Sequence, residues 1–383
     1  MAIKQPESVL FDSLRGGAAL LVLLAHTQQI LINPTWMPFS LSGRSHYGWY
    51  IYSQLGALGV MVFFVLSGYL IACSIKANID DSASAAFDWK RYFKARFNRL
   101  MPPLAMSQLL ILGIFLFLYL SGIALPEFYS TGSELYVARE KIDFKLLDYL
   151  GSWLFLNTLF FDVQSPAVNG PLWSVAQEFW FYAIAGFFVL GFSKRWGFAL
   201  AAATVFIIAI QDNKYFFYGL AVWLSGAAVA VLNKKNREHL RKHRIAAFPL
   251  AILLAALWLY MIQFNDDGQV RAKHSYIFGI FFAVLLFVMT NSEKLEVLTK
   301  SRLVTCIASV AGYSYTLYLI HFPLLLTIFY ISNTIIIGNP FAVATTAMLS
   351  GAAIILISRK LAVTFEDRRF FSRLRTSSGL STS

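Results

Sequence analysis

Long apolar segments recur along the whole chain and are separated by short polar connections. Segments of about 17 to 25 residues are long enough to cross a hydrocarbon core of roughly 30 Å as helices. The pattern therefore predicts an all-α, polytopic transmembrane bundle of about ten helices. The expected spans are residues 9 to 32, 53 to 75, 101 to 122, 171 to 192, 197 to 211, 215 to 232, 245 to 264, 275 to 291, 304 to 330 and 341 to 363.

Composition and charge agree with a membrane protein. Hydrophobic residues make up 58% of the chain and charged residues 14%, whereas soluble domains contain about 25% charged residues. The net charge of +12 does not indicate nucleic-acid binding, because the basic residues lie in short connections and are not gathered on one face. With an inner N-terminus, 25 of the 32 basic residues lie in or beside inner connections and 7 in outer ones. We therefore expect both termini in the cytoplasm.

The remaining composition indicates one membrane domain without cysteine chemistry. Cys73 and Cys306 are the only cysteines and fall inside apolar segments, so we expect neither a disulfide framework nor a metal site. The first apolar segment has charged residues near its start and no small-residue cleavage site, so we interpret it as a retained helix. We expect a transmembrane domain over residues 1–366 and a cytoplasmic tail over 367–383 with a disordered end.

One outer connection is too long for a simple turn. Residues 123 to 170 contain the apolar stretch from Tyr149 to Phe161. A re-entrant or interfacial helix here would need cover from protein or a watery cavity, and it could form a lid over an external site. An ordinary amphipathic loop helix explains the same stretch equally well.

Two ionisable residues in the first span share one helical face. Arg15 and His26 are eleven positions apart, which is roughly 16 Å along a helix and nearly a whole number of turns. Arg15 alone also suits a cation that reaches the cytoplasmic headgroups. A histidine within the membrane is a functional hypothesis by default, and a buried hydrogen-bonding role is the weaker alternative for His26.

Further polar residues lie inside the later spans. Glu178 is in the outer half of its span and must be protonated, paired or facing water. Ser174 and Tyr182 lie four residues before and after it, so all three share a face. His321 lies nearer the middle of the membrane, where a helix-packing contact and a role in the site are equally compatible with the pattern.

A pair of arginines precedes the third span. Arg96 and Arg99 are three positions apart, so their guanidinium groups face the same way and can clamp phosphates. A run that only sets topology has the same composition. Together with Arg15 and His26, the pair gives a cytoplasmic phosphate-binding edge and an acid–base group in the outer half. Coenzyme A suits that layout, with its nucleotide at the arginines and its pantetheine arm directed toward His26.

These motifs resemble those of the acyltransferase 3 family of membrane-bound O-acyltransferases. That family modifies bacterial surface polysaccharides, lipopolysaccharide O-antigen, peptidoglycan and related glycans. The match spans residues 8 to about 366 in the family's order. The matching segments are Phe11-Asp12-Ser13-Leu14-Arg15 with His26, Gly59 to Tyr69 including Ser67, Arg96-Phe97-Asn98-Arg99-Leu100 with Pro102, Pro171-Leu172-Trp173-Ser174 with Glu178 and Tyr182, and Tyr318-Leu319-Ile320-His321.

The resemblance implies a multi-pass enzyme of the bacterial cytoplasmic membrane. Its donor would be cytoplasmic acyl-CoA, most commonly acetyl-CoA, used as a substrate and not as a bound cofactor. Its acceptor would be a hydroxyl of an extracytoplasmic or lipid-linked carbohydrate. By the resemblance, His26 is the essential histidine, Arg15 is its partner in the motif, and Arg96 and Arg99 are the paired arginines.

The family pattern leaves some residues with weaker assignments. Ser13 replaces the usual glycine and Gln177 a small aliphatic residue, and neither change removes a chemical group. Only a short tail follows Glu366, so we expect the chain to act alone or with a separate partner. Glu178 is our candidate helper of His26, and the three arginines are our candidate acyl-CoA contacts. Possible further lining residues of the site are Ser67, Ser174, Tyr182 and His321.

Several functions remain open. His26 would act as a general base or carry the acyl group covalently. Intramembrane histidine, glutamate and arginine also occur in secondary transporters of small polar substrates, although the internal repeat typical of many transporters is not evident. A third class would acylate lipids or proteins around one histidine, and the arginine pattern argues against it.

Overall fold

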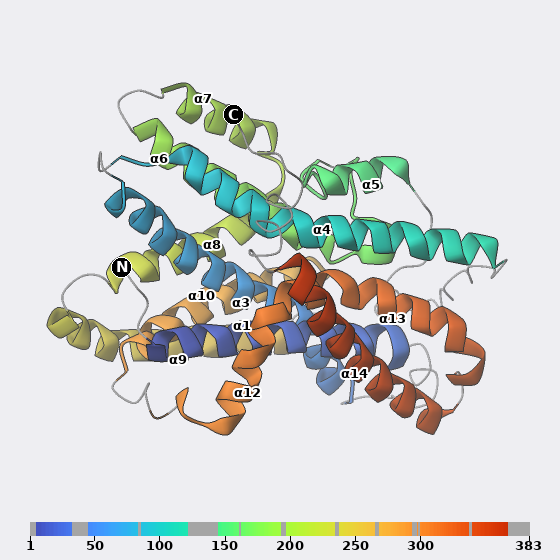
Figure 1. The fold of residues 1–383 in the computed structure, drawn as a ribbon. Helices are drawn as coiled ribbons and strands as arrows, with labels where there is room; N and C mark the ends of the chain where they lie inside the picture. Colours follow the sequence, from blue (N-terminus) through green and yellow to red (C-terminus); the bar gives the residue numbers. More distant parts are fainter. Residues whose placement is uncertain are drawn as a thin grey trace.

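The computed structural model describes residues 5–32, 45–82, 86–121, 145–160, 162–192, 197–233, 237–264, 268–292, 297, 299–336 and 339–366. Within these ranges the regular structure is helical, and long helices run side by side (Figure 1). The elements are α1 (Gln5–Thr27), the π-helix η1 (Gln28–Ile32), α3 (Ser45–Asp80), α4 (Trp89–Leu120), α5 (Leu146–Trp153), η3 (Ala167–Asn169), α6 (Leu172–Phe192), α7 (Gly197–Ala209), α8 (Lys214–Leu232), α9 (Arg237–Phe264), α10 (Gly268–Thr290), α12 (Arg302–Val310), η4 (Ala311–Tyr313), α13 (Ser314–Ile336) and α14 (Pro340–Phe365).

Seven helical stretches in the described part of the chain are long and apolar enough to cross a membrane. They are Glu7–Ile32, Leu55–Asp80, Trp89–Phe117, Leu172–Phe192, Lys214–Leu232, Arg302–Ser332 and Pro340–Phe365. Shorter apolar stretches, Ala247–Tyr260 and His274–Thr290, lie in α9 and α10. The prediction of an all-α polytopic bundle is confirmed. The expected number of ten crossings stays a prediction. The cytoplasmic location of both termini also stays a prediction, and residues 1–4 and 367–383 lie outside the described ranges.

Short polar side chains determine where several helices begin. The side chains of Asp88, Asn213 and Asn339 precede α4, α8 and α14 and accept backbone N–H bonds of 3.0, 3.1 and 3.1 Å from the residue three positions on. Each cap satisfies one of the N–H groups that a helix leaves unpaired at its start. Polar residues between the apolar runs therefore set these helix boundaries.

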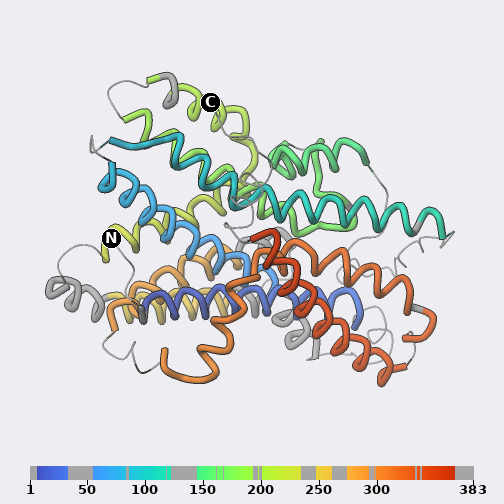
Figure 2. The backbone as a smooth tube through the Cα atoms, in the orientation of Figure 1, coloured from blue at the N-terminus to red at the C-terminus, as the bar shows by residue number. Residues whose placement is uncertain are grey.

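Glycines allow the central helices to approach closely. α3 packs between α1 and α8, and Figure 2 traces the same arrangement along the backbone. A Cβ atom at Gly68 would lie 1.9 Å from the Trp223 carbonyl oxygen, and one at Gly226 would lie 2.0 Å from the Val65 carbonyl oxygen. Small residues of this kind let membrane helices pack backbone against backbone. α3 and α8 therefore form a close reciprocal contact.

The expected span 304 to 330 is interrupted. The turn η4 separates α12 from α13, and the two helices run in different directions (Figure 1). The 3₁₀ turn contains Gly312, and a Cβ atom built at this position would have no neighbouring atom within 4 Å. Packing therefore does not require glycine here, but glycine disfavours an uninterrupted helix. Arg302–Ser332 as a whole is long and apolar enough to cross a membrane, so the predicted span contains a break, which gives α13 an N-terminus inside the protein.

The long connection that the sequence predicts on the outer side contains the short helix α5. The Tyr149 hydroxyl donates to the Gln108 carbonyl oxygen over 3.3 Å, so α5 packs against α4. Leu146, Leu147 and Leu150 on α5 are exposed, as expected for an amphipathic helix. The predicted lid also includes residues 123 to 144, which lie outside the described residues.

Candidate functional site

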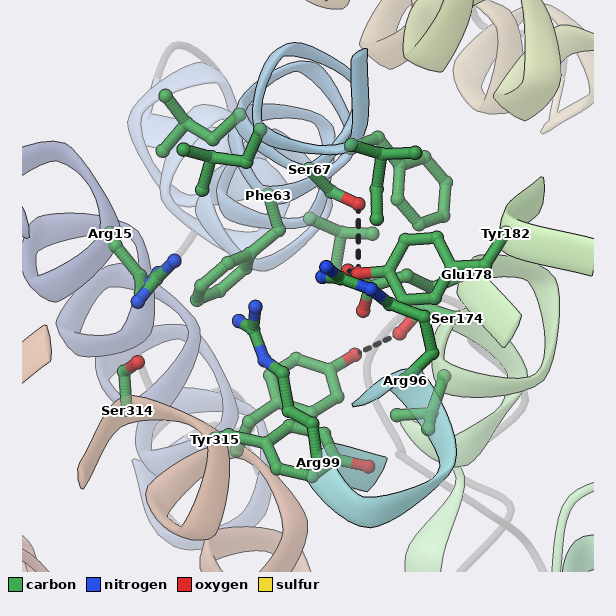
Figure 3. Close-up of a pocket in the computed structure, with 17 residues that line it drawn as sticks. Arg15, Phe63, Ser67, Arg96, Arg99, Ser174, Glu178, Tyr182, Ser314 and Tyr315 are labelled. Atoms are coloured by element: carbon green, nitrogen blue, oxygen red, sulfur yellow. Dashed lines mark hydrogen bonds between the residues drawn. The ribbon is translucent and has the colours of Figure 1, made fainter. Parts of the chain in front are cut away.

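A cavity lies where five helices meet (Figure 3). Its volume is about 60 Å³, which is enough for several water molecules. α1, α3, α4, α6 and α13 each contribute side chains to its wall. The lining residues are Arg15, Val60, Phe63, Phe64, Leu66, Ser67, Leu70, Ile71, Arg96, Arg99, Ser174, Val175, Glu178, Tyr182, Ser314, Tyr315 and Tyr318.

Three arginine side chains converge on this cavity from two helices (Figure 3). Arg96 donates to the Ser74 hydroxyl over 2.6 Å, and its guanidinium carbon lies 5.6 Å from the centre of the Tyr92 ring. Arg15 and Arg99 form no hydrogen bond or ion pair with any residue that the structure describes. Each guanidinium has five N–H donors, so the cavity presents an unusual density of unused donors.

A chain of hydrogen bonds links the wall of the cavity to its carboxylate. The Trp223 indole N–H donates to the Ser67 hydroxyl over 3.0 Å, and Ser67 donates to the Tyr182 hydroxyl over 3.1 Å. Tyr182 in turn donates to Glu178 (Figure 3). Glu178 also lies within electrostatic range of Arg15 and Arg99. The carboxylate is therefore oriented by α3 and α8 and faces the arginines.

A second hydrogen-bonded group lies on the α13 side of the cavity. A bond of 2.6 Å joins the hydroxyls of Ser174 and Tyr318, and Tyr318 donates to the Pro171 carbonyl oxygen over 3.1 Å. The Tyr318 ring also packs edge-on to Phe63, with centroids 5.9 Å apart. These contacts fix one wall of the cavity between α3, α6 and α13.

The residue that ends α14 caps the start of α13. Glu366 accepts hydrogen bonds from the Thr316 backbone N–H over 2.8 Å and from its hydroxyl over 2.6 Å. Burial raises the pKa of the Glu366 carboxyl, while the two Thr316 bonds and the charge of Arg99 oppose that rise. A carboxylate at a helix N-terminus also interacts favourably with the helix dipole. Glu366 therefore holds in place the first turn of α13, which lines the cavity.

His26 contacts His321 and not Glu178, which is its candidate helper from the sequence. His26 Nδ1 lies 2.8 Å from His321 Nε2, and His321 Nδ1 lies 3.0 Å from the Leu317 carbonyl oxygen. The Phe322 ring meets the His26 ring edge-on at 5.1 Å. Neither histidine lines the cavity, but the Tyr318 ring, which does, lies 5.7 Å from the His321 ring. The histidine pair and the cavity are thus neighbours through Tyr318.

The structure sorts the predicted site residues into two groups. Among the described contacts, the polar side chain that meets His26 is His321, whereas Glu178 faces the arginines. The expectation that Glu178 assists His26 directly therefore has no supporting contact. The first group, which shares the cavity, is Arg15, Ser67, Arg96, Arg99, Ser174, Glu178 and Tyr182. The second group is the pair His26 and His321.

Some residues around the cavity have no signal in the sequence. Trp223 and Ser74 reach the site only because α8 and α3 pack where they do. Tyr315 lines the cavity one position after Ser314, and its place in an aromatic-rich span does not distinguish it. Glu366 has a signal in principle, since a lone carboxylate that ends an apolar span needs a partner.

No cluster of three or more His, Cys, Asp or Glu side chains suited to a metal ion occurs within the described ranges. The cavity and the histidine pair present imidazole, carboxylate, hydroxyl and guanidinium groups. Guanidinium groups bind anions such as phosphates through charge-assisted, often bidentate hydrogen bonds, and imidazole exchanges protons near neutral pH. A cavity lined by three arginines beside a histidine pair is the chemical outline of the site.

Comparison with known proteins gives the family. The chain is 27% identical over 303 residues to "Peptidoglycan O-acetyltransferase OatA" of Listeria monocytogenes. The aligned region covers 70% of this chain and 45% of that protein. The chain thus spans less than half of that relative's length. It is 22% identical over 376 residues to "O-acetyl transferase" of Shigella phage Sf6, covering 95% and 96% of the two chains. No solved structure matches significantly.

A family profile described as an acyltransferase domain matches residues 9–359, which is nearly the whole chain. That range includes every predicted site residue and all the residues that line the cavity. The chain therefore belongs to the acyltransferase 3 family of membrane acyltransferases.

Proposed function

We propose that this protein is a membrane-bound O-acetyltransferase of the bacterial cytoplasmic membrane. It moves an acetyl group from cytoplasmic acetyl-CoA to a hydroxyl of an extracytoplasmic or lipid-linked carbohydrate. The observation that carries the proposal is the convergence of Arg15, Arg96 and Arg99 on one cavity, where Arg15 and Arg99 donate no hydrogen bond to any residue within the described ranges. Such an arrangement attracts an anionic ligand.

The donor's phosphates are assigned to the arginines. Arg96 and Arg99 lie near the start of α4, where the distribution of basic residues predicts the cytoplasmic side. Arg15 approaches the same cavity from α1. Guanidinium groups suit phosphate because two N–H donors can bind two oxygen atoms of one group at once. Glu178 is assigned to the same pocket, where its carboxylate orients and balances the arginines.

The acyl end of the donor is assigned to the histidine. Arg15 and His26 share α1 and lie roughly 16 Å apart along it. The Tyr318 ring lies between the cavity and His321, which contacts His26. A thin thioester arm that passes Phe63 and Tyr318 would bring its carbonyl carbon to His26 while its phosphates stay at the arginines.

The proposed chemistry is general base catalysis. The His26 imidazole takes the proton of the acceptor hydroxyl while the oxygen attacks the thioester carbonyl carbon. The carbon–oxygen bond forms, the carbon–sulfur bond breaks, and the departing thiolate takes the proton from the imidazolium. Proton transfer of this kind contributes typically 10² to 10⁴-fold. In a two-step version, His26 first carries the acyl group itself.

The acceptor class comes from the relatives. The printed name of the Listeria relative specifies peptidoglycan, and the phage relative is named as an O-acetyl transferase. We propose a carbohydrate of the cell envelope for this chain as well. Mass analysis of envelope glycans from cells with and without the protein tests this, and alkali-labile acetyl esters should appear only with it. An unchanged ester content would instead favour the transporter alternative.

The role of His26 has a direct test in the purified protein. We expect His26→Gln, reconstituted in membranes, to lose acetyl transfer by at least about 100-fold, because an amide cannot accept a proton near neutral pH. Acetyl-CoA binding should be retained, since the proposed phosphate contacts are untouched. His274→Gln is the matched control, because His274 is a buried histidine on another helix, α10. Near-normal turnover of His26→Gln would make His26 a structural residue.

A further inference from the structure

The contacts of the histidine pair determine which ring nitrogens carry protons. His321 Nδ1 lies 3.0 Å from the Leu317 carbonyl oxygen, and a carbonyl oxygen can only accept, so this nitrogen must donate. A neutral imidazole carries one N–H, and burial of His321, which is 1% exposed, disfavours the charged ring. His321 Nε2 therefore bears a lone pair.

The same reasoning continues to the second ring. His321 Nε2 lies 2.8 Å from His26 Nδ1. Because the His321 nitrogen accepts, His26 Nδ1 must donate. In neutral His26 the remaining nitrogen, Nε2, then has no proton and is free to act as a base or a nucleophile.

We propose that His321 is a positioning residue that holds His26 in the tautomer protonated at Nδ1, so that Nε2 is the reacting atom. This inference rests on the proposed transferase function. His26 Nε2 takes the proton from the acceptor hydroxyl, and the resulting imidazolium keeps its Nδ1–H bond to His321. When the carbon–sulfur bond breaks, the same Nε2 proton passes to the thiolate, so His321 neither gains nor loses a proton.

The relay ends on a group that cannot change its charge. In a serine protease triad, a carboxylate orients the catalytic histidine. Here the Leu317 backbone carbonyl oxygen plays that part through His321. A neutral relay suits a site inside the membrane, because a buried carboxylate would need its own partner. The orientation of His26 thus depends on the position of α13.

Pro323 leaves a carbonyl oxygen of α13 free to bond to neighbouring elements close to His321. Proline has no backbone N–H, so the Leu319 carbonyl oxygen lacks the partner that a regular helix would supply four residues later. That oxygen instead accepts from Asn169 Nδ2 over 2.8 Å and from the Ser107 hydroxyl over 3.0 Å. These bonds anchor α13 to α4 and η3 two residues from His321.

The Nε2 edge of the His26 ring faces α3 at Gly56. A Cβ atom at Gly56 on α3 would lie 4.0 Å from His26 Nε2 and 3.2 Å from the Ala25 Cβ. Because position 56 is glycine, no side chain of α3 at this position stands between the helix backbone and Nε2.

The test compares two substitutions of His321 in the reconstituted protein. In His321→Gln the side-chain amide still presents an oxygen to accept from His26 Nδ1, whereas in His321→Phe the ring fills the volume without an acceptor. We therefore expect His321→Phe to lower kcat by at least about 10-fold, and by as much as about 10⁴-fold if the wrong tautomer dominates. The KM for acetyl-CoA should stay within about twofold, and His321→Gln should recover most of kcat. His274→Gln is again the control.

A second measurement does not depend on turnover. Solid-state ¹⁵N NMR of histidine-labelled protein should show His26 protonated at Nδ1 and unprotonated at Nε2, and His321→Phe should shift that signature toward a mixture. A proton on His26 Nε2 in the wild type, wild-type kcat in His321→Phe, or equal losses in both variants would overturn the proposal. If the wild type lacks transferase activity but shows the expected tautomer, the proposed function fails and the relay stands.

Discussion

Arginine residues near the start of α4 differ in what their guanidinium groups contact. The Arg91 side chain is 58% exposed and pairs with Asp81 at 3.4 Å, as an ordinary surface cation does. Arg99 points into the cavity and has no hydrogen-bonding partner in the described part of the chain. Exposed pairs such as the Arg91 pair contribute about 0 to 1 kcal/mol. A ligand that hydrogen-bonds to Arg99 therefore gains more binding free energy from that contact than a ligand bound at Arg91 would gain.

Removal of the cavity arginines should weaken donor binding. We expect Arg99→Ala to lose about 1.5 to 3 kcal/mol, or roughly 10- to 150-fold in Kd for acetyl-CoA, because charge-assisted contacts are lost. Arg99→Lys should recover only part of that affinity, since an ammonium group cannot bind two oxygens in the same fork. Arg91→Ala is the matched control on the same helix. Calorimetry in detergent measures the Kd, and unchanged affinity in Arg99→Ala would contradict the donor assignment.

Residue spacing predicts neighbours on one helix but not partners on another. Ser174, Glu178 and Tyr182 line one cavity, as their separation of four positions predicts for a helical face. The same rule cannot find Trp223, which is 156 positions from its partner Ser67. It also misses the contact of His26 with His321 at 295 positions. Such pairs depend on how the helices pack, and one sequence contains no direct record of that packing.

Close helix contacts through glycine are the main feature at the scale of elements. At Gly226 and Gly68, a side chain would enter the backbone of the opposite helix. At Gly351 on α14 and Gly113 on α4, nothing lies within 4 Å of a Cβ position. The same residue type thus has a packing role in the first pair and none in the second.

This difference predicts opposite effects of one substitution. We expect Gly226→Ala to destabilise the fold by about 1 to 3 kcal/mol or more, because the methyl group would overlap the Val65 carbonyl. Gly351→Ala should be neutral or stabilising by up to about 1 kcal/mol, since alanine favours the helix. Thermal unfolding in one detergent compares the two midpoints. Equal midpoints would show that α3 and α8 are not in close contact.

Apolar patterning predicts the helices well and their irregularities poorly. The span 171 to 192 agrees with α6 (Leu172–Phe192) to within one residue, because apolar length and polar ends determine both. The pattern does not predict the turn η4, since Ala311–Tyr313 has no proline or charged residue and one glycine, Gly312, is too weak a signal to end a helix. The turn is instead stabilised from a distance, where Glu366 bonds to Thr316 at the start of α13. A local pattern cannot report a cap that comes from another helix.

At the scale of the whole molecule, the arginine cavity has a predicted side. The N-terminal halves of α1, α4 and α13 contribute Arg15, Arg99 and Ser314 to it. The distribution of basic residues predicts that these helix ends face the cytoplasm. The side of the membrane on which the cavity opens therefore decides which compartment supplies the donor.

Cysteine labelling can determine that side. In a background without Cys73 and Cys306, a cysteine in place of Lys90 should react only with a reagent that reaches the cytoplasm. A cysteine in place of Asp212, between α7 and α8, should react from outside, and both positions are exposed. Membrane-impermeant maleimide applied to intact cells and to inverted vesicles provides the comparison. Labelling of position 90 from outside would reverse the orientation and remove the cytoplasmic donor assignment.

The contact between α3 and α8 also constrains the order in which the nascent protein becomes complete. Trp223 is synthesised 156 positions after Ser67, which at about 5 to 20 residues per second is a delay of roughly 8 to 30 seconds. During that interval, α3 sits in the bilayer with the groove at Gly68 unfilled, and the Ser67 hydroxyl lacks its indole donor. Lipid or the insertion machinery must cover that groove. A ribosome that stalls before α8 therefore leaves a membrane-inserted fragment in which the Ser67 end of the hydrogen-bond chain to Glu178 lacks its donor from Trp223.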